Sequence, residues 1–524
     1  MTDGPDPQKP ASDIENFDID QSAIDIQGRR LTIGQRMRFV ASPISALTAL
    51  VALAMSCFLR FTTADALLPA LISTQRLTFF YWGQDRLANL VPALATPIEN
   101  ELANFYAQSA VMGISFFVLI MMFVWFHLRI SSRACSPLKV SLVTTTSGLL
   151  IMGLMVGTTG YTLILEQQYA LSASLFLVGT RGMMTDSNPA RFGGAVSVIA
   201  AALVNPSTVL MTPVAWLLRV DDQHVKRRMF ESIVLGIGAL GVTTVASRYL
   251  YDGASQASLY SDFSIDRMID GVPKAFDRIV GSLRVTRTAL ALSLASAVLV
   301  ARWNSLSGRL RVAYVAVPTF GLVWTVVFSG NLWVGMNLHG FRYFFPLYGA
   351  IFFLITGAIT ELATVAEARV VARDAATNRH ARFSVSRVLS LSLIAVAALG
   401  IFRLTSRIAV PILDNSRPDV AATQQYDVQI VVGNYWRVWP IVFLGRNEGH
   451  DLYGLTYRSD PVIRDVIRLV NGADAAGSIT NLLCVDIDVD TCVGDFSRYT
   501  GQHWTLSKVE SDAPLVITVD RPSP

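Results

Sequence analysis

The chain has 524 residues, of which 52% are hydrophobic and only 16% are charged, and its formal net charge is +4. Soluble globular proteins carry about 25% charged residues, so this composition excludes an ordinary soluble protein and indicates a polytopic membrane protein. The small net charge, with basic residues beside hydrophobic stretches, argues against a nucleic-acid partner and is typical of topology signals.

The N-terminal segment is polar and rich in Asp, Pro and Ser, and it contains no apolar run that could act as a signal peptide. We expect residues 1–39 to form a disordered cytosolic tail. Arginines precede the first hydrophobic stretch, and by the positive-inside rule they place the N-terminus in the cytoplasm: Arg29, Arg30, Arg36 and Arg38.

Hydrophobic stretches alternate with loops over residues 40–406, which we interpret as a transmembrane domain. About 20 apolar residues cross roughly 30 Å of hydrocarbon. We expect about nine full spans, at residues 44–59, 110–128, 140–160, 169–178, 230–246, 289–300, 312–328, 345–360 and 388–404. Long outer loops then fall at residues 60–108 and 248–287, and the second of these carries several basic residues against the positive-inside rule.

The apolar stretch 193–218 is interrupted at Asn205-Pro206-Ser207, and basic residues flank both of its ends. Pro206 removes a backbone donor and disfavours helix at the preceding residue. Irregular backbone at membrane depth survives only where protein or a water-filled cavity surrounds it. This pattern predicts a re-entrant pair of half-helices and a cavity within the bundle.

Residues 407–524 contain no further span and predict a small α/β domain on the outer side of the membrane. Alternating segments at residues 428–432 and 485–489 indicate short strands, and residues 461–469 indicate a helix. The fold class that follows is an all-α polytopic bundle with a small extracytoplasmic C-terminal domain.

Cys484 and Cys492 lie close together in this outer domain. Disulfides form outside the cytosol, and their Cα atoms must approach within about 7 Å, so we expect the chain to bend between them. Asp486, Asp488 and Asp490 alternate in the same segment, as in a calcium site, but the glycine that an EF-hand requires is missing. We expect the disulfide and no metal site.

Charged residues from three outer loops gather at one end of the expected bundle: Asp85, Glu166, and His339 with Arg342. A carboxylate there can act as general base toward a hydroxyl, and an arginine can hold a phosphate through two hydrogen bonds. These groups suit transfer from a phosphorylated lipid carrier.

Each of these residues also has a purely structural interpretation. Asp85 with Arg86 is otherwise an exposed ion pair worth less than about 1 kcal/mol. Glu166 is otherwise a solvated acid at the membrane surface, His339 a hydrogen-bonding partner of a loop, and Arg342 a snorkelling anchor.

The chain resembles the GT-C superfamily of integral-membrane glycosyltransferases in five features. They are the long first outer loop with an acid, the acid in the second outer loop, the broken hairpin, the arginine before a late span and the C-terminal outer domain. Residues 81–86, 433–440 and 453–458 are similar to segments of bacterial proteins of this type. The resemblance implies a polyprenyl-phosphate sugar as donor, on the outer leaflet.

By the same resemblance the catalytic base is Asp85 of the first loop. Many members carry two adjacent acids there, whereas Arg86 follows Asp85 in this chain. Asp65 or Glu166 would then have to act as any second acid.

We therefore expect an inverting glycosyltransferase of a bacterial inner membrane, which moves a sugar from a polyprenyl-phosphate donor to a hydroxyl of a periplasmic or cell-envelope glycan. Three groups of residues carry this expectation: the catalytic Asp85 and Glu166, the donor phosphate-binding Arg342 and His339, and the sugar-binding Tyr81, Trp82, Trp436 and Trp439. No cofactor is firmly expected, and a divalent cation stays open.

The alternative is a transporter or flippase of lipid-linked sugars, because broken helices also mark transporter sites. Transporters carry ionisable groups at mid-membrane, whereas the acids of this chain lie at the ends of the expected spans. The sequence does not identify the sugar, the acceptor, the length of the carrier lipid or the oligomeric state.

Overall fold

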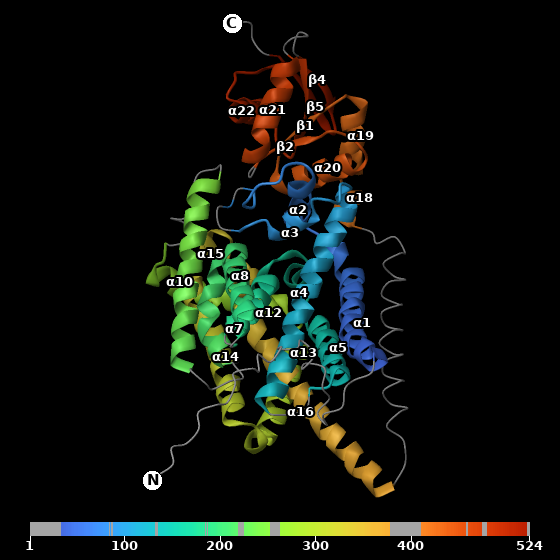
Figure 1. Cartoon of the computed structure of the whole chain (residues 1–524). Helices are drawn as coiled ribbons and strands as arrows, with labels where there is room; N and C mark the ends of the chain where they lie inside the picture. The colour runs from blue at the N-terminus through green and yellow to red at the C-terminus, as the bar shows by residue number, and fades with distance from the viewer. Residues whose placement is uncertain are drawn as a thin grey trace, which may run out of the picture.

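The computed structural model of the chain describes residues 33–82, 84, 87–131, 135–183, 185, 187–217, 225–251, 262–377, 410–456, 459–473 and 479–520. Figure 1 shows a bundle of helices with a smaller sheet domain stacked on one of its ends. We call this end of the bundle the sheet-domain end. A mostly helical bundle with a small C-terminal sheet domain is the fold class that the sequence predicts.

Six helices among the described residues are long and apolar enough to cross a membrane. The candidate spans belong to α1 (Ile33–Phe58), α4 (Glu101–Ile130), α5 (Pro137–Leu154), α10 (Val225–Leu250), α14 (Gly308–Ser329) and α16 (Phe345–Thr377). Three shorter apolar helices are α2 (Ala64–Thr74), α8 (Asn188–Val204) and α13 (Val285–Ala301). The expected number of nine full spans is not confirmed, and the span expected at residues 388–404 lies outside the described residues.

The break in the central hairpin occurs at the residue where the sequence predicts it. Helix α8 ends at Val204, and Asn205 is extended, with φ −154° and ψ 103°. Its side chain accepts a hydrogen bond from the backbone N–H of Ser207 at 3.2 Å. A short helix, η4 (Pro206–Met211), and α9 (Thr212–Leu217) follow.

Close packing of α8 against α7 (Tyr169–Met183) fixes where this break lies. A side chain at Gly179 would lie 2.7 Å from the carbonyl oxygen of Gly194, so only glycine lets the two backbones approach this closely. Asn205 is thereby held near the beginning of α7.

The two long outer loops contain helices that the sequence analysis does not predict. The first loop holds α2 and α3 (Leu90–Ala95), and the second holds α12 (Ile265–Ser282). Helix α12 buries Gly271, Ala275 and Ile279 on one face, while Ile265 and Ile269 are each 63% exposed. The helix carries three basic and three acidic residues, so α12 itself has no net charge. An amphipathic helix of this kind suits a membrane interface.

Most of the remaining short helices connect these elements near the sheet-domain end of the bundle. They are η2 (Leu59–Phe61), α6 (Gly157–Tyr161), η3 (Thr162–Glu166), α15 (Leu332–Met336) and η6 (Phe341–Phe344). One more short helix, η5 (Trp303–Ser305), joins α13 to α14 at the opposite end. Two of them, η3 and η6, supply charged side chains to the cavity described below.

The C-terminal domain is a five-stranded sheet in the order β2-β1-β3-β5-β4. Its strands are β1 (Ile430–Gly433), β2 (Tyr453–Leu455), β3 (Ile479–Val485), β4 (Thr505–Asp512) and β5 (Leu515–Asp520). Strand β1 is parallel to β2 and β3, and β5 is antiparallel to β3 and β4. The helices are α18 (Pro411–Asp414), α19 (Arg417–Gln425), α20 (Tyr435–Asn447), α21 (Asp460–Ala473) and α22 (Val489–Thr500).

The prediction of a strand at residues 485–489 is wrong, because β3 ends at Val485. The chain turns at Asp486, whose φ is 55°, and Asp488 caps α22 by accepting a hydrogen bond from the backbone N–H of Thr491 at 2.8 Å. This reversal brings Cys484 and Cys492 together in a disulfide, with their Cα atoms 5.9 Å apart. No three His, Cys, Asp or Glu residues of the described part of the chain are grouped as a metal site.

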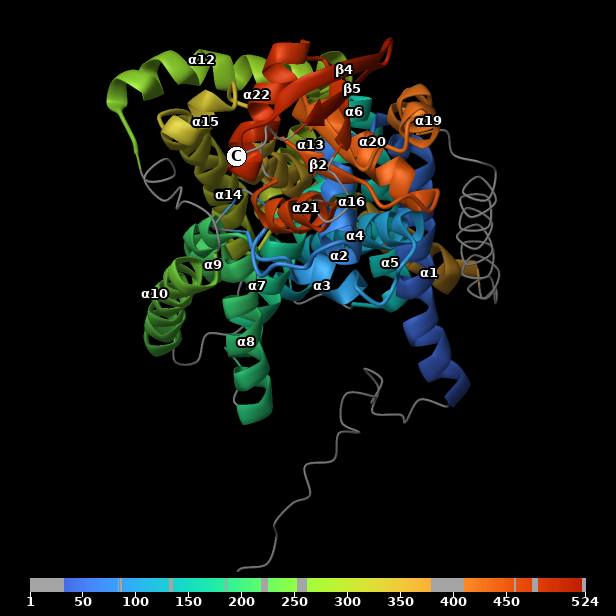
Figure 2. The same ribbon diagram turned by 90° about the horizontal axis from the view of Figure 1, so that it is seen from above.

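The sheet domain is packed firmly onto the bundle through α20, which lies over α2 and α4 (Figure 2). The rings of Trp82 and Trp439 are 5.6 Å apart, and both side chains are fully buried. An ion pair between Arg76 and Asp465, at 2.9 Å, supports the same junction.

Candidate functional site

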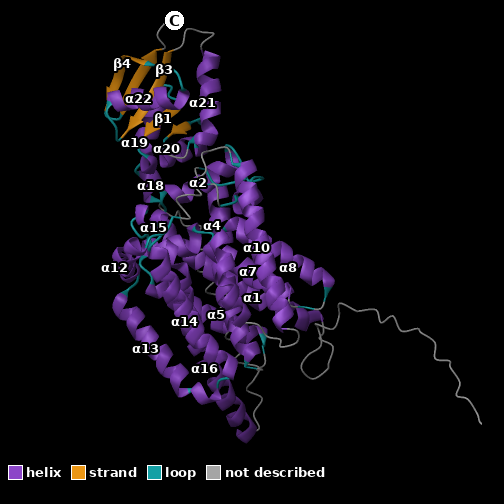
Figure 3. Ribbon diagram, turned by 90° about the vertical axis from the view of Figure 1, so that its left-hand side faces the viewer, coloured by secondary structure: helices purple, strands orange, loops and turns teal. Residues whose placement is uncertain are grey.

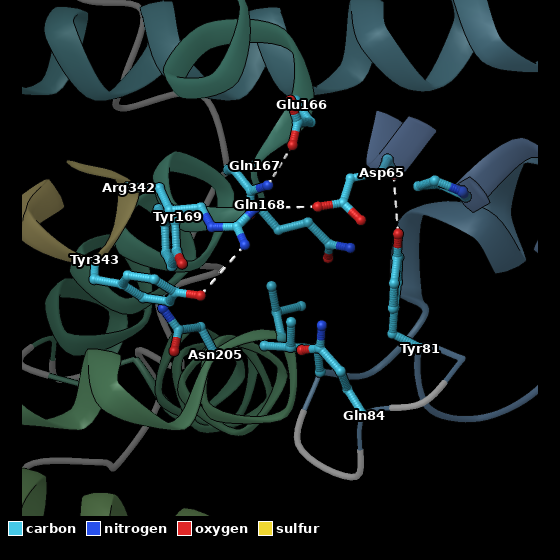
Figure 4. A pocket seen from close by; sticks show the side chains of 13 residues that line it. Asp65, Tyr81, Gln84, Glu166, Gln167, Gln168, Tyr169, Asn205, Arg342 and Tyr343 are labelled. Carbon is cyan, nitrogen blue, oxygen red and sulfur yellow. Dashed lines mark hydrogen bonds and ion pairs between the residues drawn. The ribbon is translucent and has the colours of Figure 1, made fainter. Parts of the chain in front are cut away.

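A polar cavity lies at this junction, between α2, η3, the first turn of α7, the break after α8 and η6 (Figure 4). Its volume is about 60 Å³, which is room for a few water molecules. The polar side chains of its wall are Asp65, Gln84, Glu166, Gln167, Gln168, Asn205 and Arg342, and Tyr81, Tyr169 and Tyr343 complete its aromatic part.

Asp65 is the best-anchored acid of this cavity. It is buried in the first turn of α2, and its Oδ2 accepts a hydrogen bond from Nη1 of Arg342 at 3.2 Å. The hydroxyl of Tyr435, in α20, donates to Oδ1 of the same carboxylate. Tyr81 donates to the main-chain oxygen of Asp65 at 2.9 Å. A buried carboxylate requires such partners, and here they come from both domains.

Arg342 lies at the boundary between this cavity and a second, more apolar chamber. The two chambers share Arg342, Tyr343 and other wall residues. The wall of the second chamber is largely apolar and includes Met211, Trp324, Phe328, Phe345 and Pro346. A guanidinium at such a boundary can hold a phosphate diester. A polar substituent of that phosphate would lie in the first chamber and a hydrocarbon substituent in the second.

Glu166, at the end of η3, contributes the second carboxylate of the cavity. It accepts hydrogen bonds from Nε2 of Gln167 at 2.6 Å and from Oγ1 of Thr162 at 3.2 Å. Burial and then the negative charge of Asp65 raise the pKa of Glu166 to about 7, although Arg342 opposes the shift. A carboxyl group with this pKa can accept or donate a proton at neutral pH.

Two amide oxygens in the cavity wall lack a protein partner. Oε1 of Gln84 and Oε1 of Gln168 are buried and accept no hydrogen bond from the described part of the chain. Leaving such an atom unsatisfied costs about 1–3 kcal/mol. Hydroxyl groups of a sugar are donors that would satisfy them.

The aromatic residues expected to bind sugar fall into different environments. Tyr81 lines the cavity, but Trp82 and Trp439 are buried against each other and offer no free face to a sugar. The packing of the two domains therefore corrects these two assignments. Trp436 is 54% exposed beside Tyr435 and keeps a ring face available.

His339 does not reach either chamber. It is buried, and its Nε2 lies 3.3 Å from the carbonyl oxygen of Ser329. Burial lowers its pKa, so the imidazole is neutral at pH 7 and adds no positive charge for a phosphate. We therefore withdraw His339 from the phosphate site.

Asp85 and Arg86, which the sequence analysis places at the centre of the site, lie outside the described residues. Their neighbours Gln84 and Leu87 both line the cavity. The role expected for Asp85 thus stays a prediction, while the described part of the cavity contains two other acids.

If the cavity is an active site, replacing Tyr435 by Phe is expected to lower kcat about 10–100-fold, because a hydrogen bond to a charged group is worth about 1.5–3 kcal/mol and its loss frees the carboxylate of Asp65. The KM for the donor should change much less, because Tyr435 does not line the cavity. Kinetics of the purified variants would measure both constants. Tyr453→Phe is the matched control, since that hydroxyl donates to Asp451 at 3.1 Å, an exposed contact away from the cavity. Equal loss in both variants would show that Tyr435 acts only through the stability of the domain.

No protein-family model matches the chain, and no curated protein matches it. Among solved structures the chain is similar to the crystal structure of ArnT from Cupriavidus metallidurans bound to undecaprenyl phosphate, with 13% sequence identity and a TM-score of 0.48. The similarity covers 93% of this chain and 98% of that chain.

Proposed function

We propose that the chain is a membrane glycosyltransferase that moves a sugar from a polyprenyl-phosphate donor to a hydroxyl of a cell-envelope glycan. The observation that carries this proposal is the position of Arg342. One guanidinium lies between a chamber with two carboxylates and a chamber of aromatic and aliphatic side chains. This arrangement suits a substrate in which a phosphate joins a sugar to a long hydrocarbon.

In this proposal the sugar occupies the polar chamber and the first prenyl units occupy the apolar one. The acceptor oxygen attacks the anomeric carbon as the bond between that carbon and the phosphate oxygen breaks, so the configuration inverts. The phosphate leaves with the electron pair of the broken bond, and Arg342 stabilises its growing negative charge. Asp65 holds the guanidinium in place.

Glu166 takes the proton of the acceptor hydroxyl. Its pKa of about 7 makes it a better base than an ordinary carboxylate while leaving it largely ionised just above neutrality. Asp65 already accepts hydrogen bonds from Arg342 and Tyr435, so it is the weaker candidate. Asp85 remains the base that the sequence resemblance implies.

The acceptor glycan approaches from the sheet domain, where the exposed ring of Trp436 can stack on sugar. The disulfide between Cys484 and Cys492 supports a place for this domain outside the cytosol. The N-terminus is then cytoplasmic, the protein lies in a bacterial inner membrane, and transfer occurs at its periplasmic face.

The proposal is tested by mass analysis of envelope glycans from a strain that lacks the chain, together with transfer assays on the purified protein and synthetic polyprenyl-phosphate sugars. We expect one sugar to be missing from the glycans of the strain. We expect the purified protein to transfer that sugar from the synthetic donor to an acceptor in an assay that contains no transport step. Unchanged glycans, or movement of the lipid-linked sugar without transfer, would favour the flippase alternative. Activity in Glu166→Gln combined with inactivity in Asp85→Asn would assign the base to Asp85.

A further inference from the structure

A second cavity, unrelated to the polar site, opens on the side of the bundle between α5, α13 and α16. It is an apolar groove of about 480 Å³, and it shares no residue with the two chambers around Arg342. Its wall is aliphatic except for one charged residue, Arg287: Leu149, Leu150, Gly153, Leu154, Leu290, Ala291, Leu294, Ala295, Val298, Ile355, Ala358, Ile359 and Leu362. Figure 3 shows α13 at the edge of the bundle, below α12.

The groove has the depth of one membrane leaflet. Its wall on α13 runs from Arg287 to Val298, and at 1.5 Å per residue this stretch is about 16 Å long. The hydrocarbon core of a bilayer is about 30 Å thick. The groove therefore reaches from the interface near α12 to about the middle of the membrane.

The charge lies at the interfacial end of the groove. Arg287 is in the first turn of α13, next to α12, and is exposed. It makes no hydrogen bond or ion pair with the part of the chain that the structure describes. Because α12 has the character of an interfacial helix, Arg287 lies at the depth of lipid headgroups.

We propose that this groove binds one acyl chain of a glycerophospholipid with an anionic headgroup, from the leaflet on the sheet-domain side, and that Arg287 pairs with its phosphate. A single chain matches both the length of the groove and its aliphatic wall. The exposed guanidinium of Arg287 at the interfacial end adds a contact for a headgroup phosphate, which an apolar helix of another protein would not use. The site is a specific lipid site separate from the donor.

Gly153 provides a way to fill the groove without disturbing the protein. A Cβ atom at this position would meet no neighbouring atom within 4 Å, and Gly153 lies within α5, where replacement of glycine favours the helix. Because Gly153 is part of the groove wall, Gly153→Phe adds a ring at the space of the acyl chain. Gly241→Phe in α10 is the matched control, because a Cβ atom there also meets no neighbouring atom within 4 Å and Gly241 is not part of the groove wall.

The test is native mass spectrometry of the full-length protein, extracted in detergent and supplied with phosphatidylglycerol or phosphatidylcholine. We expect the wild-type protein and Gly241→Phe to retain one phosphatidylglycerol in preference to phosphatidylcholine, and Gly153→Phe to lose it. Arg287→Ala should weaken the retention of phosphatidylglycerol about fivefold and that of phosphatidylcholine less, because the choline cation already offsets the charge of its phosphate.

Equal retention of phosphatidylglycerol by Gly153→Phe and Gly241→Phe would overturn the proposal. So would displacement of the bound lipid by a polyprenyl phosphate, or a dimer that only Gly153→Phe dissociates, because the occupant would then be the donor lipid or a second copy of the chain. These outcomes concern a site apart from Arg342, so sugar transfer can be measured independently in the same variants.

Discussion

Replacing Glu166 by Gln is expected to lower the rate of sugar transfer about 10²–10⁴-fold, the usual contribution of a general base. The amide has nearly the same shape but cannot accept the proton of the acceptor. In the wild-type protein the rate should rise with pH through about 7 and then level off, because the raised pKa keeps Glu166 protonated below that value. The pH dependence of kcat, measured with the purified protein, checks both statements.

Although Glu166→Gln should lower the rate of transfer, it should not lower the thermal stability of the protein above neutral pH. The pKa of Glu166 is higher in the folded chain than in an unfolded one, so the folded state favours the neutral form. Its contribution to stability is present at low pH and is lost as the pH rises through about 7. Gln cannot ionise, so Glu166→Gln should be at least as thermally stable as the wild type at pH 8.

The control is Glu99→Gln, because Glu99 is an exposed acid of the first loop, and this variant should leave both rate and stability unchanged. A Glu166→Gln variant with normal kcat would exclude it as the base.

Replacing Arg342 by Lys is expected to weaken use of the donor by at least about tenfold, although the positive charge is kept. A lysine cannot form the two parallel hydrogen bonds that a guanidinium makes with a phosphate, and each hydrogen bond to a charged group is worth about 1.5–3 kcal/mol. The substitution also removes the hydrogen bond to Asp65. The KM for a polyprenyl-phosphate sugar should rise in Arg342→Lys and rise further in Arg342→Ala.

The control for this prediction is Arg278→Lys, because Arg278 is an exposed residue of α12 that lines neither chamber. Its donor kinetics should equal those of the wild type. If Arg342→Lys also retains the wild-type KM and kcat, Arg342 is a membrane anchor and the phosphate must be held elsewhere.

The sequence predicts the helical course of the chain well, because long apolar runs and a proline act locally. The break at Asn205 could be predicted from Pro206, which disfavours helix at the residue before it. Helix α12 escaped prediction because its apolar residues are spaced on one face and never form a run. The strand expected at residues 485–489 failed for a similar reason, since alternating Asp and Val also suit a turn followed by a capped helix.

The site is less predictable, because its contacts join distant parts of the chain. Asp65 appears in the sequence as one acid in an apolar stretch, and its partners Arg342 and Tyr435 lie 277 and 370 residues further along. The burial of Trp82 likewise depends on Trp439 of the other domain. Arg342 and Glu166 are candidates from the sequence because each charge lies at the end of an apolar span, and both line the cavity.

The contact between Tyr435 and Asp65 has a consequence for biogenesis. Membrane helices are inserted in chain order during synthesis, and domains fold as they emerge. Asp65 is therefore in the membrane long before Tyr435 has been made, translocated and folded against it. Until that moment the carboxylate of Asp65 lacks one of its hydrogen-bond donors. If the cavity acts on a lipid-linked sugar as we propose, a nascent or truncated chain that lacks α20 should be inactive until the last domain has folded.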